Sequence, residues 1–206
     1  MEKNIELYID KLASKAPTPG GGGVAALSAS LGAALASMVC NLTIGKPKYS
    51  QFEDELKVIL EESRILSQKC FELAAEDEVA FEPLSRAYSL PSTTDEEKKI
   101  KDEVLESALV RAANVPMMSA QAACDAIDIH RRLVERGSKL VISDVGVGVQ
   151  MARSALLSAA LNVKINTKLM KNRAVADEMN EQIEALVKKG SATADAVYCA
   201  VSEMLK

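Results

Sequence analysis

The chain lacks tryptophan altogether, and phenylalanine, tyrosine and tryptophan together make up only 3% of its 206 residues. Proteins that bind single-stranded nucleic acids usually stack the bases on aromatic side chains. The formal net charge of −4 also provides no overall attraction for phosphates. We therefore expect no nucleic-acid partner. The N-terminal residues are charged and do not resemble a signal peptide, so we expect a cytoplasmic protein.

Metal ligands are also scarce. The chain has four cysteines, none in a Cys-x-x-Cys pair, and one histidine. Because zinc sites usually combine closely spaced cysteine and histidine residues, we expect no metal. His130 precedes two arginines in a polar stretch and is expected on the surface. Because no Ser-His-Asp or Cys-His arrangement is recognisable in the sequence, we do not expect this histidine to act as a general base. The cysteines are interpreted as reduced core thiols: Cys40, Cys70, Cys124 and Cys199.

Helix-forming residues dominate what is present. Hydrophobic residues make up 48% of the chain, mostly alanine, leucine, valine and isoleucine, and no segment alternates as a half-buried strand would. The sequence therefore predicts an all-α fold, a single domain over residues 1–206 built as a mostly antiparallel bundle of long helices. The helices are expected at 3–15, 22–43, 51–88, 95–136 with an interruption near 114–116, 139–162, 167–189 and 192–205.

The segment 22–43 is small or apolar on nearly every face, which is typical of a helix buried on all sides. It is long enough to cross a membrane, but it is rich in alanine and serine and contains Asn41, so we expect no membrane span. Ser28, Gly32 and Ala36 recur at four-residue steps and would let another helix approach closely. This helix is expected at the centre of the bundle or at a subunit interface.

Four consecutive glycines, Gly20 to Gly23, follow Pro17 and Pro19 and lead directly into this helix. They could form a tight turn or hinge. They could also leave the free N–H groups of the helix start open to an anion or a polarised carbonyl. The segment is neither a P-loop nor a dinucleotide fingerprint, because no Gly-Lys-Ser/Thr closes it and no strand precedes it.

Two acidic residues could hold or transfer a proton. Asp144 lies in apolar sequence, between Ser143 and the pair Gly146 and Gly148. We expect it to be mostly buried, where it would cap a helix, pair with an arginine or act in proton transfer. Asp77 lies in a run of three acids that cannot all face one way, so it is either a surface residue or turned inward.

The other candidates are polar residues at helix ends, in loops and on one helix face. Each has an ordinary structural interpretation, as a helix cap or a solvated side chain, beside that of a ligand-binding group. These candidates are Asn41, Lys46, Tyr49, Asn162, Lys164, Asn166 and Lys168.

The order of these segments along the chain resembles the cyclodeaminase/cyclohydrolase family. The matching segments are 16–27, 42–46 with Tyr49, 77–81, 114–116, 143–144 and 162–166. Only the first segment is specific by itself, and the resemblance rests on the occurrence of all the segments in the order found in the family. Gly23 departs from the family pattern, in which we expect serine after three glycines, so any contact made by that hydroxyl is missing here.

The resemblance implies a dimer-forming helical enzyme acting on folate one-carbon units without a metal or another cofactor. Either 5-formiminotetrahydrofolate closes to 5,10-methenyltetrahydrofolate with loss of ammonia, or the methenyl compound is hydrolysed to 10-formyltetrahydrofolate. Both reactions need a positioned proton carrier, for which Asp144 is the first candidate and Asp77 the second. The alternative is a non-catalytic helical dimer that binds folate or serves as an interaction module.

The remaining candidates would bind the substrate. The Gly20–Gly23 backbone would line the pocket, and Lys46 or the face of Lys164 and Lys168 would hold the anionic glutamate tail. The polar side chains that complete this expected set are Asn41, Tyr49, Ser143, Asn162 and Asn166.

Overall fold

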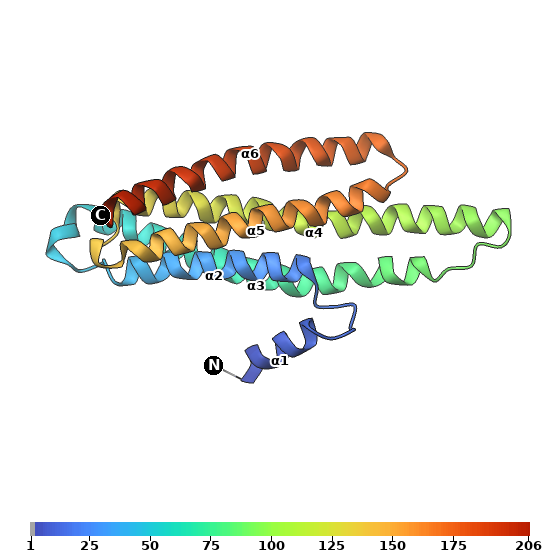
Figure 1. The fold of residues 1–206 in the computed structure, drawn as a ribbon, viewed down its shortest axis with the longest axis horizontal. Coiled ribbons are helices and arrows are strands. Elements are labelled where there is room, and N and C mark those ends of the chain that lie inside the picture. Colours follow the sequence, from blue (N-terminus) through green and yellow to red (C-terminus); the bar gives the residue numbers. More distant parts are fainter. Residues whose placement is uncertain (1–2) are drawn as a thin grey trace.

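The structure is a computed structural model that describes residues 3–206, so Met1 and Glu2 of the charged start lie outside it. Figure 1 shows an elongated bundle of long helices, with a short N-terminal helix projecting from it. Within residues 3–206 there is no strand, which confirms the predicted all-α class. The elements are α1 (Lys3–Leu12), α2 (Gly21–Asn41), η1 (Pro47–Phe52), α3 (Glu53–Tyr88), α4 (Asp95–Arg136), η2 (Lys139–Val141), α5 (Ile142–Leu169) and α6 (Arg173–Met204).

Helices α2 to α5 form the centre of the bundle. Both α2 and α4 pack along α3 and α5, and α6 covers the outer side of α4 and α5. The row of small residues on α2 allows the close approach predicted for it. A Cβ added at Gly32 would lie 2.9 Å from the carbonyl oxygen of Gly148 and 3.3 Å from the amide nitrogen of Ala152, so α2 and α5 touch there through their backbones.

Two predicted helix ends are confirmed. Thr94 caps α4: its hydroxyl accepts the Glu97 N–H at 3.1 Å, and the Glu97 carboxylate accepts the Thr94 N–H at 2.9 Å. This reciprocal pair satisfies N–H groups that have no partner within the helix. At the other end, α4 stops at Gly137, as predicted.

Three predicted interruptions are wrong, because packing overrides local helix-breaking signals. Pro116 lies buried inside a continuous α4, and α5 continues past Asn162 and Asn166 to Leu169. Gly190 does not end a helix but lies buried within α6. A Cβ there would overlap Leu156 and lie 3.0 Å from the sulfur of Cys124, so this glycine lets α6 pack closely on its neighbours.

The prediction for the cysteines is only partly right. Cys40 and Cys70 are buried, whereas Cys124 is half-buried and Cys199 is exposed. Burial raises the pKa of the Cys40 thiol to about 12 and that of Cys70 to about 11. These two thiols therefore stay protonated and unreactive at neutral pH.

The surface prediction for His130 is wrong, since its side chain is completely buried. Its Nε2 hydrogen-bonds the carbonyl oxygen of Gly32 at 2.9 Å. A Cβ at Gly148 would overlap the imidazole ring, and one at Gly146 would lie 3.0 Å from Val201. Both glycines that follow Asp144 therefore make room for packing.

Burial of His130 makes stability depend on pH. It lowers the pKa of the imidazole from 6.5 to about 4, so the unfolded chain binds a proton that the folded protein excludes. Stability should fall as pH drops from about 6.5 to about 4, by up to about 3 kcal/mol from this group. Urea unfolding of the wild type and of His130→Phe across this range measures the effect. An equal loss of stability in both proteins would contradict it.

Two helices are long and apolar enough to cross a membrane by length and composition. They are Gly21–Asn41, with a mean hydropathy of 1.8, and Lys139–Leu169, with 1.4. Within the described part of the chain both are central helices of the bundle, and each buries a row of alanine, glycine and valine residues. Their apolar character is therefore explained in part by the core.

Candidate functional site

The glycine segment starts α2, as predicted, and borders a cavity of about 230 Å³. Gly20 is the N-cap residue and offers no side chain to the free N–H groups of the first turn. Backbone from Gly20 to Gly22 forms one wall, and α3, α4 and α5 supply the others. The main side chains in these walls are Asp77, Phe81, Tyr88, Pro116, Asn162, Ile165, Asn166 and Leu169.

Asp77 is the acid of its run that turns inward. A Cβ added at Gly22 would lie 2.6 Å from the Cγ of Asp77, inside van der Waals contact. Glycine at this position therefore leaves space for a carboxylate from α3 beside the first turn of α2. A negative charge is favourable there, because the helix dipole and the free N–H groups make the N-terminus positive. The neighbouring Glu78 instead pairs with Lys11 at 3.0 Å.

The pKa of Asp77 is raised above its ordinary value. Burial is the largest cause, the charge of Glu78 adds to it, and the N–H of Gly23 opposes it. A raised pKa brings a carboxyl group closer to neutrality, where it can both accept and return a proton. The cavity therefore holds one proton carrier at a helix start.

Two asparagines of α5 line the same cavity as Asp77. The Nδ2 of Asn162 donates to the carbonyl oxygen of Ser158 at 2.9 Å, and the Nδ2 of Asn166 donates to that of Asn162 at 2.8 Å. Both side chains are thus fixed on the helix one turn apart. Neither is a helix cap, and both line the cavity, where an amide oxygen can accept a hydrogen bond from a ligand.

Gly23 does not line the cavity. A Cβ there would lie 3.3 Å from the carbonyl oxygen of Ala74 and 3.6 Å from the hydroxyl of Tyr8. It would also lie 3.9 Å from an Oδ2 oxygen of Asp77, so a serine hydroxyl at this position could reach the carboxylate that lines the cavity, and glycine removes that contact. Tyr8, which is not among the predicted site residues, is half-buried, and through it α1 reaches this end of the bundle.

Asp144 lies at the other end of α5. It is in the first turn and half-buried, as Asp77 is, while Ser143 is exposed, so the expectation of a mostly buried carboxylate is met only in part. Asn162 follows about five turns later, or about 27 Å along the axis at about 1.5 Å per residue. Within one chain, the two predicted proton carriers therefore belong to different ends of the bundle.

Other predicted residues gather at the Asp144 end. Lys46 donates to the hydroxyl of Ser138 at 3.1 Å, and the hydroxyl of Tyr49 accepts the N–H of Lys139 at 3.0 Å. That hydrogen bond is the main cause that lowers the pKa of Tyr49. Asn41 is exposed at the last turn of α2. The loop after α2 is thus fixed against the start of α5.

The two predicted lysines of α5 differ. Lys164 pairs with Glu184 of α6 at 3.0 Å, so its charge is already partly compensated. Lys168 is exposed one turn further along, at the glycine end of the bundle. It adjoins Leu169, which lines the cavity. Of the two, Lys168 is better placed to attract an anionic group.

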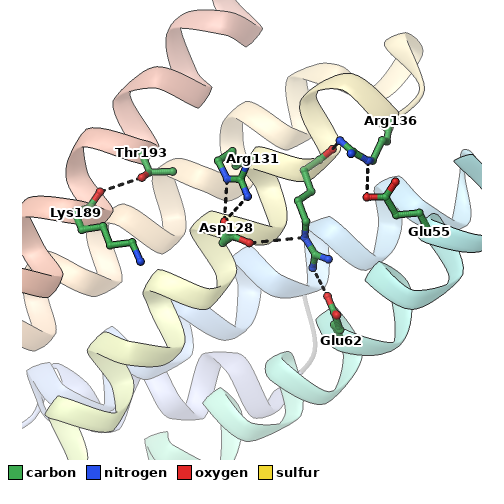
Figure 2. A network of polar contacts seen from close by, with 8 residues as sticks. Glu55, Glu62, Asp128, Arg131, Arg136, Lys189 and Thr193 are labelled. Carbon is green, nitrogen blue, oxygen red and sulfur yellow. Dashed lines mark hydrogen bonds and ion pairs between the residues drawn. The ribbon is translucent and has the colours of Figure 1, made fainter.

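A larger groove, of about 680 Å³, lies between α3, α4 and α6. Figure 2 shows the charged side chains in and around it, and most are already paired. Asp128 contacts Arg131 at 2.8 Å, Arg132 contacts Glu62, and Arg136 lies 2.6 Å from Glu55. Such pairs neutralise one another. The smaller cavity, with its free helix start and the half-buried carboxyl group of Asp77, is the candidate active site.

Comparison with known proteins identifies the family of the chain. Residues 4–185 match the model of the family described as formiminotransferase-cyclodeaminase. A methenyltetrahydrofolate cyclohydrolase of Methylorubrum extorquens is 44% identical over 95% of this chain and 94% of its own. A formimidoyltransferase-cyclodeaminase of Sus scrofa is 27% identical over 94% of this chain, which covers 36% of that protein.

A solved structure has the same fold. The crystal structure of formiminotetrahydrofolate cyclodeaminase from Thermotoga maritima superposes with a TM-score of 0.80 and 29% identity, covering 98% of this chain and 94% of the other. The match extends over the whole bundle, as expected if the arrangement of helices that forms the cavity is shared. The chain belongs to the formiminotransferase-cyclodeaminase family.

Proposed function

We propose that this protein is a folate one-carbon enzyme that hydrolyses 5,10-methenyltetrahydrofolate to 10-formyltetrahydrofolate. The observation that carries the proposal is the 44% identity, over nearly the full length of both chains, to a relative named methenyltetrahydrofolate cyclohydrolase. The cavity at the start of α2 supplies what this reaction needs, namely a proton carrier and exposed N–H donors in a partly enclosed space.

Hydrolysis would proceed by addition of water to the cationic methenyl carbon. Asp77 accepts one proton from the attacking water and returns it to N5 as the bond between the carbon and N5 breaks. The second proton is lost to solvent as the formyl C=O forms on N10. A single carboxyl group can serve both steps because burial keeps its pKa above that of a free aspartate. Its negative charge also stabilises the cation.

The walls of the cavity suit a flat, polar ring. Phe81 and Tyr88 provide apolar and aromatic surface, and the amide oxygens of Asn162 and Asn166 can accept hydrogen bonds from ring N–H groups. The N–H groups of the α2 start can bind a ring carbonyl. The glutamate tail would extend from the cavity toward Lys168, because Lys46 lies at the opposite end of the bundle, where it donates to Ser138.

Cyclodeamination is the second candidate activity, favoured by the TM-score of 0.80 with the Thermotoga maritima cyclodeaminase. In that reaction N10 attacks the formimino carbon of 5-formiminotetrahydrofolate, and the leaving nitrogen needs a proton before it departs as ammonia. Asp77 would supply this proton. Both reactions use the same carbon and proton carrier, and neither requires a metal or another cofactor. A cytoplasmic homodimer remains part of the proposal.

Absorbance of the methenyl chromophore tests the proposal. Purified protein is added to 5,10-methenyltetrahydrofolate in one assay and to 5-formiminotetrahydrofolate in another. We expect enzyme-dependent loss of the chromophore in the first, and a gain in the second if the protein is also a cyclodeaminase. No change above the spontaneous rate in either assay would contradict the proposal and favour a non-catalytic folate-binding or interaction module.

A further inference from the structure

We propose that Tyr8 of α1 is a positioning residue of the candidate site, and that its hydroxyl group donates a hydrogen bond to the Asp77 carboxylate, directly or through one water molecule. This inference rests on the proposed function and deepens it. It gives a role to α1, which projects from the bundle (Figure 1), although none of its described residues lines the cavity.

The side chain of Tyr8 carries a buried polar group. Its hydroxyl oxygen is inaccessible to solvent and has no hydrogen-bond partner within residues 3–206. A buried donor without an acceptor is unfavourable, because it has lost its hydrogen bonds to water and gained none in the protein. The hydroxyl group therefore needs an acceptor that it can reach by a small movement.

Tyr8 and Asp77 approach each other beside the backbone of Gly23. A Cβ added to Gly23 would lie 3.6 Å from the hydroxyl oxygen of Tyr8 and 3.9 Å from the Oδ2 of Asp77. Both oxygens therefore border the same small space, which glycine leaves unfilled. A small rotation of either side chain, or one bridging water molecule, would join the two groups.

Of the two acceptors around this space, the carboxylate is the better one. The other is the carbonyl oxygen of Ala74, which lies 3.3 Å from the same added Cβ. Ala74 is inside α3, where the geometry of the helix supplies its carbonyl oxygen with the N–H of Glu78. A carboxylate has more acceptor sites, and a hydrogen bond to a charged acceptor is stronger than one to a neutral acceptor.

A second contact of α1 holds Tyr8 in place. Lys11 lies one turn after Tyr8, so the two side chains share a face of the helix. The ammonium group of Lys11 donates to the carboxylate of Glu78 at 3.0 Å, and Glu78 is the neighbour of Asp77 on α3. This face of α1 is therefore set against the part of α3 that carries the proton carrier.

The hydroxyl group of Tyr8 remains a donor at neutral pH. Its pKa is raised, first by burial and then by the charges of Glu78 and Asp77. A donated hydrogen bond favours the ionised form of a carboxyl group and so lowers its pKa. Tyr8 would therefore limit the rise in pKa that burial causes at Asp77, and would keep the carboxylate ionised until it accepts the proton of the attacking water.

The other groups that act on Asp77 are few. Burial is the largest influence on its pKa, the N–H of Gly23 lowers this pKa, and the charge of Glu78 raises it. Among the described residues that line the cavity, Tyr88 is the only other titratable group, and the walls from α4 and α5 carry neutral side chains. Removal of the Tyr8 hydroxyl group should therefore be visible in the pKa of Asp77.

Tyr8→Phe tests this inference, because it removes the hydroxyl group and leaves the ring. Carboxyl ¹³C NMR, with the Asp77 signal assigned by its loss in Asp77→Asn, measures the pKa of Asp77 without substrate. We expect this pKa to rise by about one pH unit. The acidic limb of the kcat profile should move by the same amount, so that kcat falls about 10-fold at pH values below it, with little change in KM. Tyr198→Phe makes the same change at an exposed site on α6 and should alter neither quantity.

Two double variants separate the hydroxyl group from other effects. Gly23→Ser combined with Tyr8→Phe places a new hydroxyl group beside Asp77, and should restore the lower pKa and most of the lost activity. Gly23→Ala combined with Tyr8→Phe adds the same Cβ, at the same 3.3 Å from the carbonyl oxygen of Ala74, but no hydroxyl group. It should restore neither.

An unchanged Asp77 pKa and an unchanged kcat profile in Tyr8→Phe would overturn the inference, and so would equal behaviour of the two double variants. Failure of the proposed function is distinguishable from these outcomes. The wild type would then be inactive on both folates, while the NMR titration would still report whether Tyr8 acts on Asp77.

Discussion

Replacing Asp77 by asparagine is expected to lower kcat for the methenyl substrate by about 10²–10⁴-fold, the usual contribution of one positioned proton carrier. Asparagine has nearly the same shape, so the cavity and the packing of α3 on α2 should persist. Because asparagine cannot hold a proton for transfer, the loss should appear mainly in kcat and less in KM. Steady-state kinetics with the chromophore assay measures both constants.

Two further measurements separate a catalytic role of Asp77 from a structural one. Burial raises the pKa of this carboxyl group, so its ionised form destabilises the folded state above the ordinary pKa of aspartate. Asp77→Asn should therefore unfold at the same temperature as the wild type or higher, at neutral pH. Glu76→Gln, at the exposed preceding position, is the matched control and should keep full activity. Unchanged turnover in Asp77→Asn would remove Asp77 from the mechanism.

The second large effect is expected from Gly22→Ala. The added methyl group would overlap the Asp77 carboxylate, so either the side chain moves out of the cavity or α3 moves away from α2. We expect a loss of activity of about 10²-fold or more, together with a loss of stability of about 1–3 kcal/mol from overpacking. Turnover and urea unfolding of the same preparation measure the two effects.

Gly21→Ala is the matched comparison for this variant. A methyl group there would lie 3.6 Å from the Nδ2 of Asn162, an ordinary van der Waals contact that leaves Asp77 in place. We expect it to lose much less activity than Gly22→Ala. Equal losses in both variants would mean that glycine is needed for flexibility of the segment and not to make room for the carboxylate.

The helices were predictable because their apolar residues recur at helical spacing and their ends carry ordinary signals. Thr94 with Glu97 is such a signal, and so is the glycine segment at the start of α2. Local sequence failed where packing decides. Gly190 resembles a helix break in the sequence, but it makes room for the side chain of Leu156. His130 is polar, and only the glycines facing it explain its burial.

The same limit applies to the candidate site. The inward turn of Asp77 was one of two possibilities in the sequence, and the structure selects it through the space left by Gly22. The separation of Asp144 from the cavity could not be predicted while α5 was expected to end or bend at Asn162. Because α5 is in fact continuous, the number of residues between Asp144 and Asn162 fixes the distance between them along the helix axis.

A crystal structure with bound 5-formyltetrahydrofolate, a stable analogue of the substrate, tests the central claim most directly. We predict that the ring occupies the cavity at the start of α2, with the one-carbon group within hydrogen-bonding distance of the Asp77 carboxylate and the tail directed toward Lys168. Binding in the groove between α3, α4 and α6, with the glycine cavity empty, would contradict the account.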